Sequence, residues 1–211
     1  TADEGFNQLS TWLVDYSEKW PSGFYFEYGG EMESSGESSQ SIADKLPIAI
    51  FIIVILLVMQ FNSLRKPLII LSTIPLGFIG VVWGLVVAKS FFGFMTLLGI
   101  ISLAGIVINN AIVLLERIKL EVEVNGLSAQ SAIVEAAQRR MRPILLTTAT
   151  TVFGLLPLYL GGGEMWEPMA VGIMAGLMFS TLLTLGFIPV LYALLYKVSY
   201  SGYEYANNVK A

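Results

Sequence analysis

Five long apolar segments occupy this chain from Leu46 onward, and none of them has an Asp, Glu, Lys or His in its interior. A helix rises 1.5 Å per residue, so about 20 apolar residues cross the roughly 30 Å hydrocarbon core of a bilayer. A water-soluble fold could bury one such segment, but five in succession would leave almost nothing to face water. The charged fraction, 13%, is also about half the usual value for soluble domains. The sequence therefore predicts an all-α polytopic membrane protein, with a bundle at 41–198 whose spans lie at about 41–61, 68–88, 91–115, 143–160 and 168–196.

The distribution of Lys and Arg predicts the orientation of these spans, because basic residues stay preferentially on the cytoplasmic side in short loops. One side carries Arg65, Lys66, Arg117, Lys119, Arg139, Arg140, Arg142, Lys197 and Lys210, whereas the other carries Lys19, Lys45 and Lys89. We therefore expect a multi-pass protein of a bacterial inner membrane, with a periplasmic amino terminus and a cytoplasmic tail at 199–211. Nine of the 16 acidic residues lie in the first 44 positions, where they are expected to form a solvated face.

Residues 1–40 differ in composition from the rest and are predicted to form a small α/β remnant outside the membrane. Apolar residues recur at helical spacing between positions 6 and 16, and the turn signal Pro21-Ser22-Gly23 precedes an alternating, strand-like stretch at 24–28. One helix and one strand cannot close a core. We therefore expect this region to be the end of a larger, severed or interrupted domain.

The stretch at 31–41 is polar and rich in Ser, so it is predicted to be a linker into the first span. The chain begins at Thr1 without a Met or a signal peptide. An external amino terminus without an export signal suggests a piece of a longer protein, or one that begins after a processing event.

Small residues mark where the spanning helices are expected to touch. Gly80 and Gly84 have the small-xxx-small spacing that lets two backbones approach closely, and Gly105 and Gly154 are assigned the same packing role in the third and fourth spans. Pro75 is expected to kink the second span, since it lacks an N–H and its ring clashes with the preceding turn.

Polar side chains inside the third and fourth spans are the candidate functional groups. Counted from the cytoplasmic ends, Asn109 lies about 10 Å deep and Thr147 and Thr151 about 7 and 13 Å deep, so neighbouring helices would form a polar patch at one level. Such Thr residues can simply bond between helices, at about 0.6 kcal/mol each. Two consecutive amides, Asn109 and Asn110, are harder to satisfy without a polar cavity or a partner.

The connections between spans have their own signals. Residues 118–138 are predicted to form a cytoplasmic surface helix, with Ser128 as a cap within it. On the external side, Gly161 to Pro168 is predicted to make a tight reversal that places Trp166 at the membrane interface.

Several classes of function lack support in the sequence. The chain has no His and no Cys, so thiolate metal sites and disulfides are excluded, and Ser72, Ser102 and Ser180 have no partner base for hydrolysis. We expect no enzyme activity, no metal site, no cofactor and no nucleic-acid binding, since the cluster of arginines at 139–142 is explained by topology.

Four membrane motifs resemble the last stretch of resistance-nodulation-division (RND) efflux permeases of the AcrB/HAE1 type. A fifth, before the first span, resembles the end of the periplasmic porter domain of the same family, which assigns residues 1–40 to that domain. The motifs are IPLGFIGVVWG (74–84), FGFMTLLGIISLAGIVINNAIVLLERI (92–118), RRMRPILLTTATTVFGLLPL (139–158), GGGEMWEPMAVGIMAGLMFSTLLTLGFIPVLYALL (161–195) and WPSGFYFEYGGEMES (20–34).

The resemblance implies twelve helices in two repeated halves, of which the five here look like the eighth to the twelfth. It implies a homotrimer that docks a periplasmic adaptor and an outer-membrane channel, exports amphiphilic small molecules and is driven by proton flow. The remaining amino-terminal half of the permease is the implied partner of this chain within the bilayer.

The resemblance also implies a coupling site. In the family, a pair of acidic residues on the fourth helix faces a polar group on the tenth and a Thr and an Arg on the eleventh. The matching positions are Asn109, with Asn110 beside it, then Thr147 and Arg140, and Thr151 lies one turn beyond Thr147. Many drug pumps of the family have a Lys at the position of Asn109, so the resemblance does not determine the coupling ion or its stoichiometry for this chain.

No titratable group lies at mid-membrane in this chain, so the isolated chain is expected to transport nothing. A second interpretation, from another class, is a non-transporting membrane scaffold or regulatory half-protein that assembles with another complex. A complementary chain with the first seven spans would favour the transporter.

Overall fold

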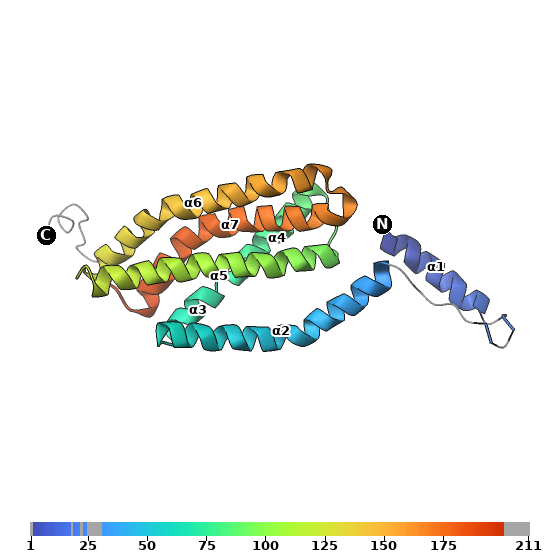
Figure 1. The fold of residues 1–211 in the computed structure, drawn as a ribbon, viewed down its shortest axis with the longest axis horizontal. Helices are drawn as coiled ribbons and strands as arrows, with labels where there is room; N and C mark the ends of the chain where they lie inside the picture. The colour runs from blue at the N-terminus through green and yellow to red at the C-terminus, as the bar shows by residue number, and fades with distance from the viewer. Residues whose placement is uncertain (1, 18, 22, 25–30, 201–211) are drawn as a thin grey trace. The chain divides into compact units, whose positions relative to one another are not determined.

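A computed structural model of the chain describes residues 2–17, 19–21, 23–24 and 31–200 (Figure 1). The chain divides into two compact units, Thr1–Leu46 and Pro47–Ala211, and each is described by itself. The helices of the described residues are, in order, α1 (Ala2–Ser17), α2 (Glu31–Phe61), α3 (Arg65–Leu71), α4 (Ile74–Ala88), α5 (Phe94–Glu123), α6 (Ala129–Gly161) and α7 (Gly163–Leu195).

The first unit contains the helix predicted from the spacing of apolar residues. Trp12 and Tyr16 of α1 stack with their ring centroids 5.0 Å apart. The turn signal is confirmed, because the Phe24 N–H donates to the Pro21 carbonyl at 3.2 Å and Gly23 has φ +104°. The predicted strand falls almost wholly on residues 25–28, which lie outside the described residues, so the α/β remnant stays a prediction.

The prediction of a linker at 31–41 is wrong, because these residues are the first turns of α2. They precede an apolar helix directly, so they extend it without the cost of nucleating a new one. A side-chain hydrogen bond of 3.3 Å from Gln40 to Asp44, one turn apart, lies on this stretch.

The second unit is a bundle of helices long and apolar enough to cross a membrane. Five candidate spans lie at Ser35–Phe61, Arg65–Ala88, Phe94–Glu123, Ala129–Gly161 and Gly163–Leu195, as the apolar segments predict. α7 is the central helix, since it contacts α3, α4, α5 and α6 (Figure 1). Half of its most apolar stretch is buried in the bundle, against 6% for α2, so α2 leaves its apolar surface uncovered.

The core of the bundle consists of two apolar clusters stacked along α5 and α7. One lies near the end where α2 finishes and α6 begins, with buried residues Leu57, Phe61, Ile69, Ile70, Ala111, Leu114, Leu115, Ile118, Ile133, Ala136, Ile188 and Tyr192. The other lies further along the same helices, with Val81, Leu85, Leu103, Val107, Val171 and Leu177.

The second span is broken in two where a kink was predicted from Pro75. Pro75 follows the first residue of α4 and has no N–H to continue the helical ladder. The hydroxyls of Ser72 and Thr73 donate to the carbonyls of Ile69 and Ile70 at 2.7 and 2.6 Å. Side chains therefore satisfy carbonyl groups at the break between α3 and α4.

The prediction of a separate surface helix at 118–138 is wrong. Its first residues continue α5 to Glu123 and its last residues begin α6 at Ala129. At 1.5 Å per residue, α5 is about 45 Å long, so it extends well beyond the hydrocarbon core. The Ser128 cap is confirmed, because its hydroxyl accepts a hydrogen bond from the Ser131 N–H at 3.4 Å, and Gly126 (φ +66°) makes the turn.

The external reversal between α6 and α7 is shorter than predicted, with Gly162 standing alone between the two helices. A Cβ at Gly162 would collide with the Leu158 carbonyl oxygen, and Gly163 adopts a left-handed φ of +70°. Glycine is therefore required at both positions. Trp166 lies in the first turn of α7 and is exposed.

Candidate functional site

α5 has two faces of opposite character. Its inner face, which packs against α7 and α4, carries Thr96, Gly99, Leu103, Val107, Ala111, Leu114, Ile118 and Glu121, all buried. Its opposite face presents small or polar residues, namely Ser102, Gly105, Asn109 and Glu116, which are exposed. These four positions fall within one narrow stripe, because residues seven apart on a helix share a face. We call them the α5 polar stripe.

Asn109 therefore lies on the surface of this chain, at the middle of the α5 polar stripe, and Asn110 is half-buried beside it. Within the described part of the chain, no hydrogen bond links either amide to another side chain. At the end of the stripe, the Gln60 amide of α2 donates to the Glu116 carboxylate at 2.7 Å. This bond ties α2 to α5 next to the stripe.

The structure does not direct the predicted functional threonines of α6 toward a neighbouring helix. Thr147 and Gly154 are exposed and Thr151 is half-buried. The Thr147 hydroxyl donates to the Ile144 carbonyl, and that of Thr151 to the Thr147 carbonyl, each at 2.9 Å. These hydroxyls bond within their own helix, and the face of α6 that they occupy points away from the core.

The threonine of α6 that reaches a neighbouring helix is Thr148, which sequence analysis did not single out. Its hydroxyl lies 2.8 Å from that of Thr181 on α7, and both side chains are buried. Ser180 and Thr184 continue this polar stretch of α7 and are buried as well, and the Thr184 hydroxyl has no hydrogen-bond partner among the described residues. Their spacing along α7 was the signal that could have identified them.

The predicted site arginine, Arg140, is partly buried, and its Nε is buried without a hydrogen-bond partner in the part of the chain that the structure describes. Its neighbour Arg139 lies 2.5 Å from Glu135 and 3.6 Å from Glu121. The structure thus brings Arg139, and not Arg140, against the carboxylates of Glu135 on α6 and Glu121 on α5.

Glu121 is the centre of a buried polar cluster that the sequence did not reveal. Its side chain is 1% exposed and lies 2.5 Å from the Arg117 guanidinium, while the Asn125 amide donates to it, also at 2.5 Å. Its backbone carbonyl accepts the Leu127 N–H at 3.0 Å. Glu121 therefore links the end of α5 to the following turn, through Asn125 and Leu127, and to Arg139 of α6.

The glycines proposed for helix packing divide into two pairs. Gly80 and Gly84 lie against α7, where a Cβ on Gly80 would come within 2.6 Å of Phe179 Cβ and one on Gly84 would collide with Ala175 Cβ. A Cβ on Gly105 or Gly154 would meet no atom within 4 Å. Gly80 and Gly84 therefore lie at a close approach of α4 to α7, whereas Gly105 and Gly154 face open space among the described helices.

These features define a class of protein: a polytopic helical membrane protein whose small and polar residues line an uncovered face. The chain belongs to the AcrB/AcrD/AcrF family of RND permeases, which it matches over residues 11–196.

Relatives and solved structures agree with this assignment. The chain is 35% identical over 181 residues to the swarming motility protein SwrC of Bacillus subtilis, which covers 84% of this chain and 17% of the relative. It is 37% identical over 182 residues to the multidrug resistance protein MdtC of Pantoea ananatis, at 84% and 18% coverage. The crystal structure of a heavy metal efflux pump superposes with a TM-score of 0.71 at 28% identity, over 90% of this chain and 19% of that one. The chain thus spans less than a fifth of the length of these proteins.

Proposed function

We propose that this chain forms one side of the ion-coupling bundle of an RND exporter driven by the proton motive force. The observation that carries the proposal is the outward position of the α5 polar stripe. An amide and a hydroxyl facing hydrocarbon are costly, and polar groups in spanning helices face protein or a water-filled cavity. The stripe is therefore a surface for further helices of the permease.

The exposed face of α6 that carries Thr147 and Gly154 also supports an interface with further helices of the permease. Gly105 and Gly154 leave open space where a partner backbone can approach closely. We propose that Asn109, with Asn110, Thr147, Thr151 and Arg140, meets titrating carboxylates on those helices. An Asn accepts and donates hydrogen bonds to a carboxylate without a charge of its own, so the titrating groups belong to the partner helices.

The remaining features of the whole pump are part of the proposal. The Arg and Lys residues at the ends of α3, α5, α6 and α7 support a cytoplasmic carboxyl terminus and a periplasmic amino terminus in a bacterial inner membrane. We infer export of amphiphilic small molecules by a homotrimer with a periplasmic adaptor and an outer-membrane channel. The name of MdtC supports this substrate class. Another relative is called a nickel-cobalt-cadmium resistance protein, so metal salts belong in the transport assay as competing cargo.

A chimeric permease tests the function. In it, this chain replaces the matching stretch of the Pantoea ananatis MdtC protein, and proton-dependent efflux is measured in proteoliposomes. We expect the chimera to transport, Asn109→Leu to reduce efflux to the level of empty vesicles, and Val87→Ala, at a 74% exposed position of α4 outside the site, to leave it unchanged. Equal efflux from the Asn109 variant and its control would refute the coupling role. The 211-residue chain alone is expected to show no efflux.

A second experiment tests whether partner helices cover the α5 polar stripe. The chain contains no cysteine, so a single introduced cysteine can carry a label. A nitroxide label is attached at Asn109→Cys or, as a control, at Val87→Cys, which is 74% exposed on α4. Collision with lipid-dissolved oxygen is then measured in the chain alone and in the chimera. The label at position 109 should be reached by oxygen in the chain alone and be shielded in the chimera, and the control label should be reached in both.

A further inference from the structure

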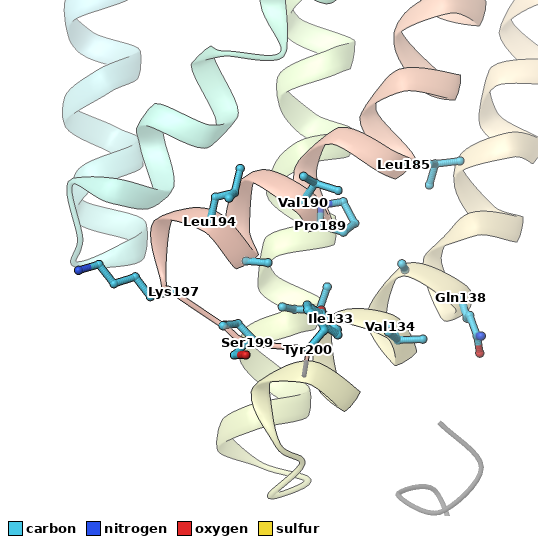
Figure 2. A pocket seen from close by; sticks show the side chains of 13 residues that line it. Ile133, Val134, Gln138, Leu185, Pro189, Val190, Leu194, Lys197, Ser199 and Tyr200 are labelled. Atoms are coloured by element: carbon cyan, nitrogen blue, oxygen red, sulfur yellow. The ribbon is translucent and has the colours of Figure 1, made fainter. Parts of the chain in front are cut away.

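An apolar cavity of about 830 Å³ lies between the start of α6 and the end of α7. Figure 2 shows Ile133 and Val134 of α6 opposite Pro189 and Val190 of α7, with Ser199 and Tyr200 below them. The cavity is within the size range of small-molecule sites in proteins, about 300–1,000 Å³. We call it the α6–α7 groove.

The lower wall of the groove is fixed by the chain that follows α7. The Gln130 amide near the start of α6 donates to the Ser199 carbonyl at 2.9 Å, and the Val198 N–H donates to the Ala193 carbonyl at 2.9 Å. The segment after α7 is therefore held across the beginning of α6. This segment therefore borders the groove at its lower end.

The charge around the groove has one sign. Lys197 is the charged residue among the described residues that line it, and no Asp or Glu joins it there. Figure 2 shows its side chain extending from the end of α7 away from the apolar lining. The Arg65 guanidinium lies 5.8 Å from the centre of the Tyr196 ring, so a second cation stands at the same end of α7.

We propose that the α6–α7 groove binds an anionic phospholipid, with an acyl chain along the apolar walls and the phosphate at Lys197. The groove lies at the end of the bundle where the arginines of α6 mark the membrane surface. Its walls are therefore at the depth of the part of an acyl chain nearest the headgroup. Basic residues between spanning helices at this depth attract anionic headgroups. This site is separate from the α5 polar stripe and does not depend on transport.

Lipid retention by the purified 211-residue chain tests the proposal. The chain is taken from bilayers of equal parts phosphatidylglycerol and phosphatidylcholine, and the lipids still bound are counted by native mass spectrometry. We expect preferential retention of phosphatidylglycerol. Lys197→Asn should lower that retention about fivefold, the effect of one surface cation. Equal retention of both lipids, or no effect of Lys197→Asn, would overturn the proposal.

The matched control is Lys89→Asn. Lys89 and Lys197 both follow a helix and both have left-handed backbones, with φ +55° and +53°, a conformation that Asn accepts readily. Lys89→Asn should leave retention unchanged, and an equal loss there would show a general charge effect and overturn the site.

Two further variants test the groove itself. Ala137→Phe or Ala193→Phe, at lining positions, should fill the cavity and reduce retention of both lipids, whereas unchanged retention in a folded variant would overturn it. A chain that ends at Tyr200 distinguishes lipid from the following residues of the chain as the occupant. It should retain phosphatidylglycerol as the full chain does. A marked gain in retention would identify residues 201–211 as the occupant and overturn the lipid proposal.

Discussion

The hydroxyls of Thr148 on α6 and Thr181 on α7 lie 2.8 Å apart, and both are buried where these two helices meet. Hydrophobic burial does not drive helices together in lipid, so close packing and bonds of this kind carry the association. The pair therefore sets the register between α6 and α7 near the middle of the bundle.

Removal of either hydroxyl should weaken this contact. We expect Thr148→Val and Thr181→Val each to lower the free energy of unfolding, with a coupling energy of about 0.6 kcal/mol in the double-mutant cycle. Titration with dodecyl sulfate in mixed micelles, followed by circular dichroism, measures it. Thr150→Val is the control, because its hydroxyl bonds to a carbonyl of its own helix. A coupling energy of zero would show that the two hydroxyls do not interact in the membrane.

Neutralising Glu121 should loosen the connection between α5 and α6. Glu121→Gln leaves Arg117 without its partner, and we expect a loss of about 2 kcal/mol, between the values for exposed and fully buried pairs. Glu123→Gln is the matched control, because this carboxylate is 60% exposed and lies 3.8 Å from Lys119, so its loss should stay below about 0.5 kcal/mol. Titration with dodecyl sulfate, followed by circular dichroism, measures the free energy of unfolding of both variants. Equal losses of stability in the two variants would contradict the central role of Glu121.

The two pairs of glycines should respond in opposite ways to alanine. Gly80→Ala forces α4 away from α7 and is expected to cost about 1–3 kcal/mol, as overpacking does. Gly105→Ala and Gly154→Ala add a methyl group in open space and should be neutral or slightly stabilising in the 211-residue chain, since alanine favours helix. Destabilisation by Gly105→Ala in the chain alone would place a packing partner within it.

The reversal between α6 and α7 should depend on one glycine conformation. Gly163→Ala places a side chain at φ +70° and is expected to cost about 1–2 kcal/mol. Gly161→Ala is the control. Gly161 is the last residue of α6, and a Cβ at this position meets nothing within 4 Å. Comparable thermal unfolding of both variants in detergent would argue against strain at Gly163.

The spans could be predicted from the sequence because the bilayer itself sets their length and apolarity. These properties do not depend on which helices pack against each other. Gly80 and Gly84 were likewise predictable from their spacing. The helix at 31–41 was missed because Ser-rich composition suggests a linker, while the apolar helix that follows determines the outcome. The Glu121 cluster could not be predicted, since its partners come together only when α5 and α6 meet.

The candidate site was predicted less completely. Helical periodicity placed Asn109 and Gly105 on one face but could not tell whether that face looks inward or outward. Thr148, which meets Thr181, lies one position from the predicted Thr147, which on a helix is a rotation of about 100°, so periodicity alone did not show which threonine reaches α7. Assigning the inner face required the position of α7, and this comes from tertiary packing.

The central place of α7 has a consequence for biosynthesis. It is the last of the five spans to emerge from the ribosome, yet α3, α4, α5 and α6 all pack on it. The earlier spans therefore enter the membrane before the helix that joins them exists, and they wait with their inner faces uncovered. A nascent chain stopped before α7 lacks the common core of the bundle and leaves exposed the surfaces that α7 covers.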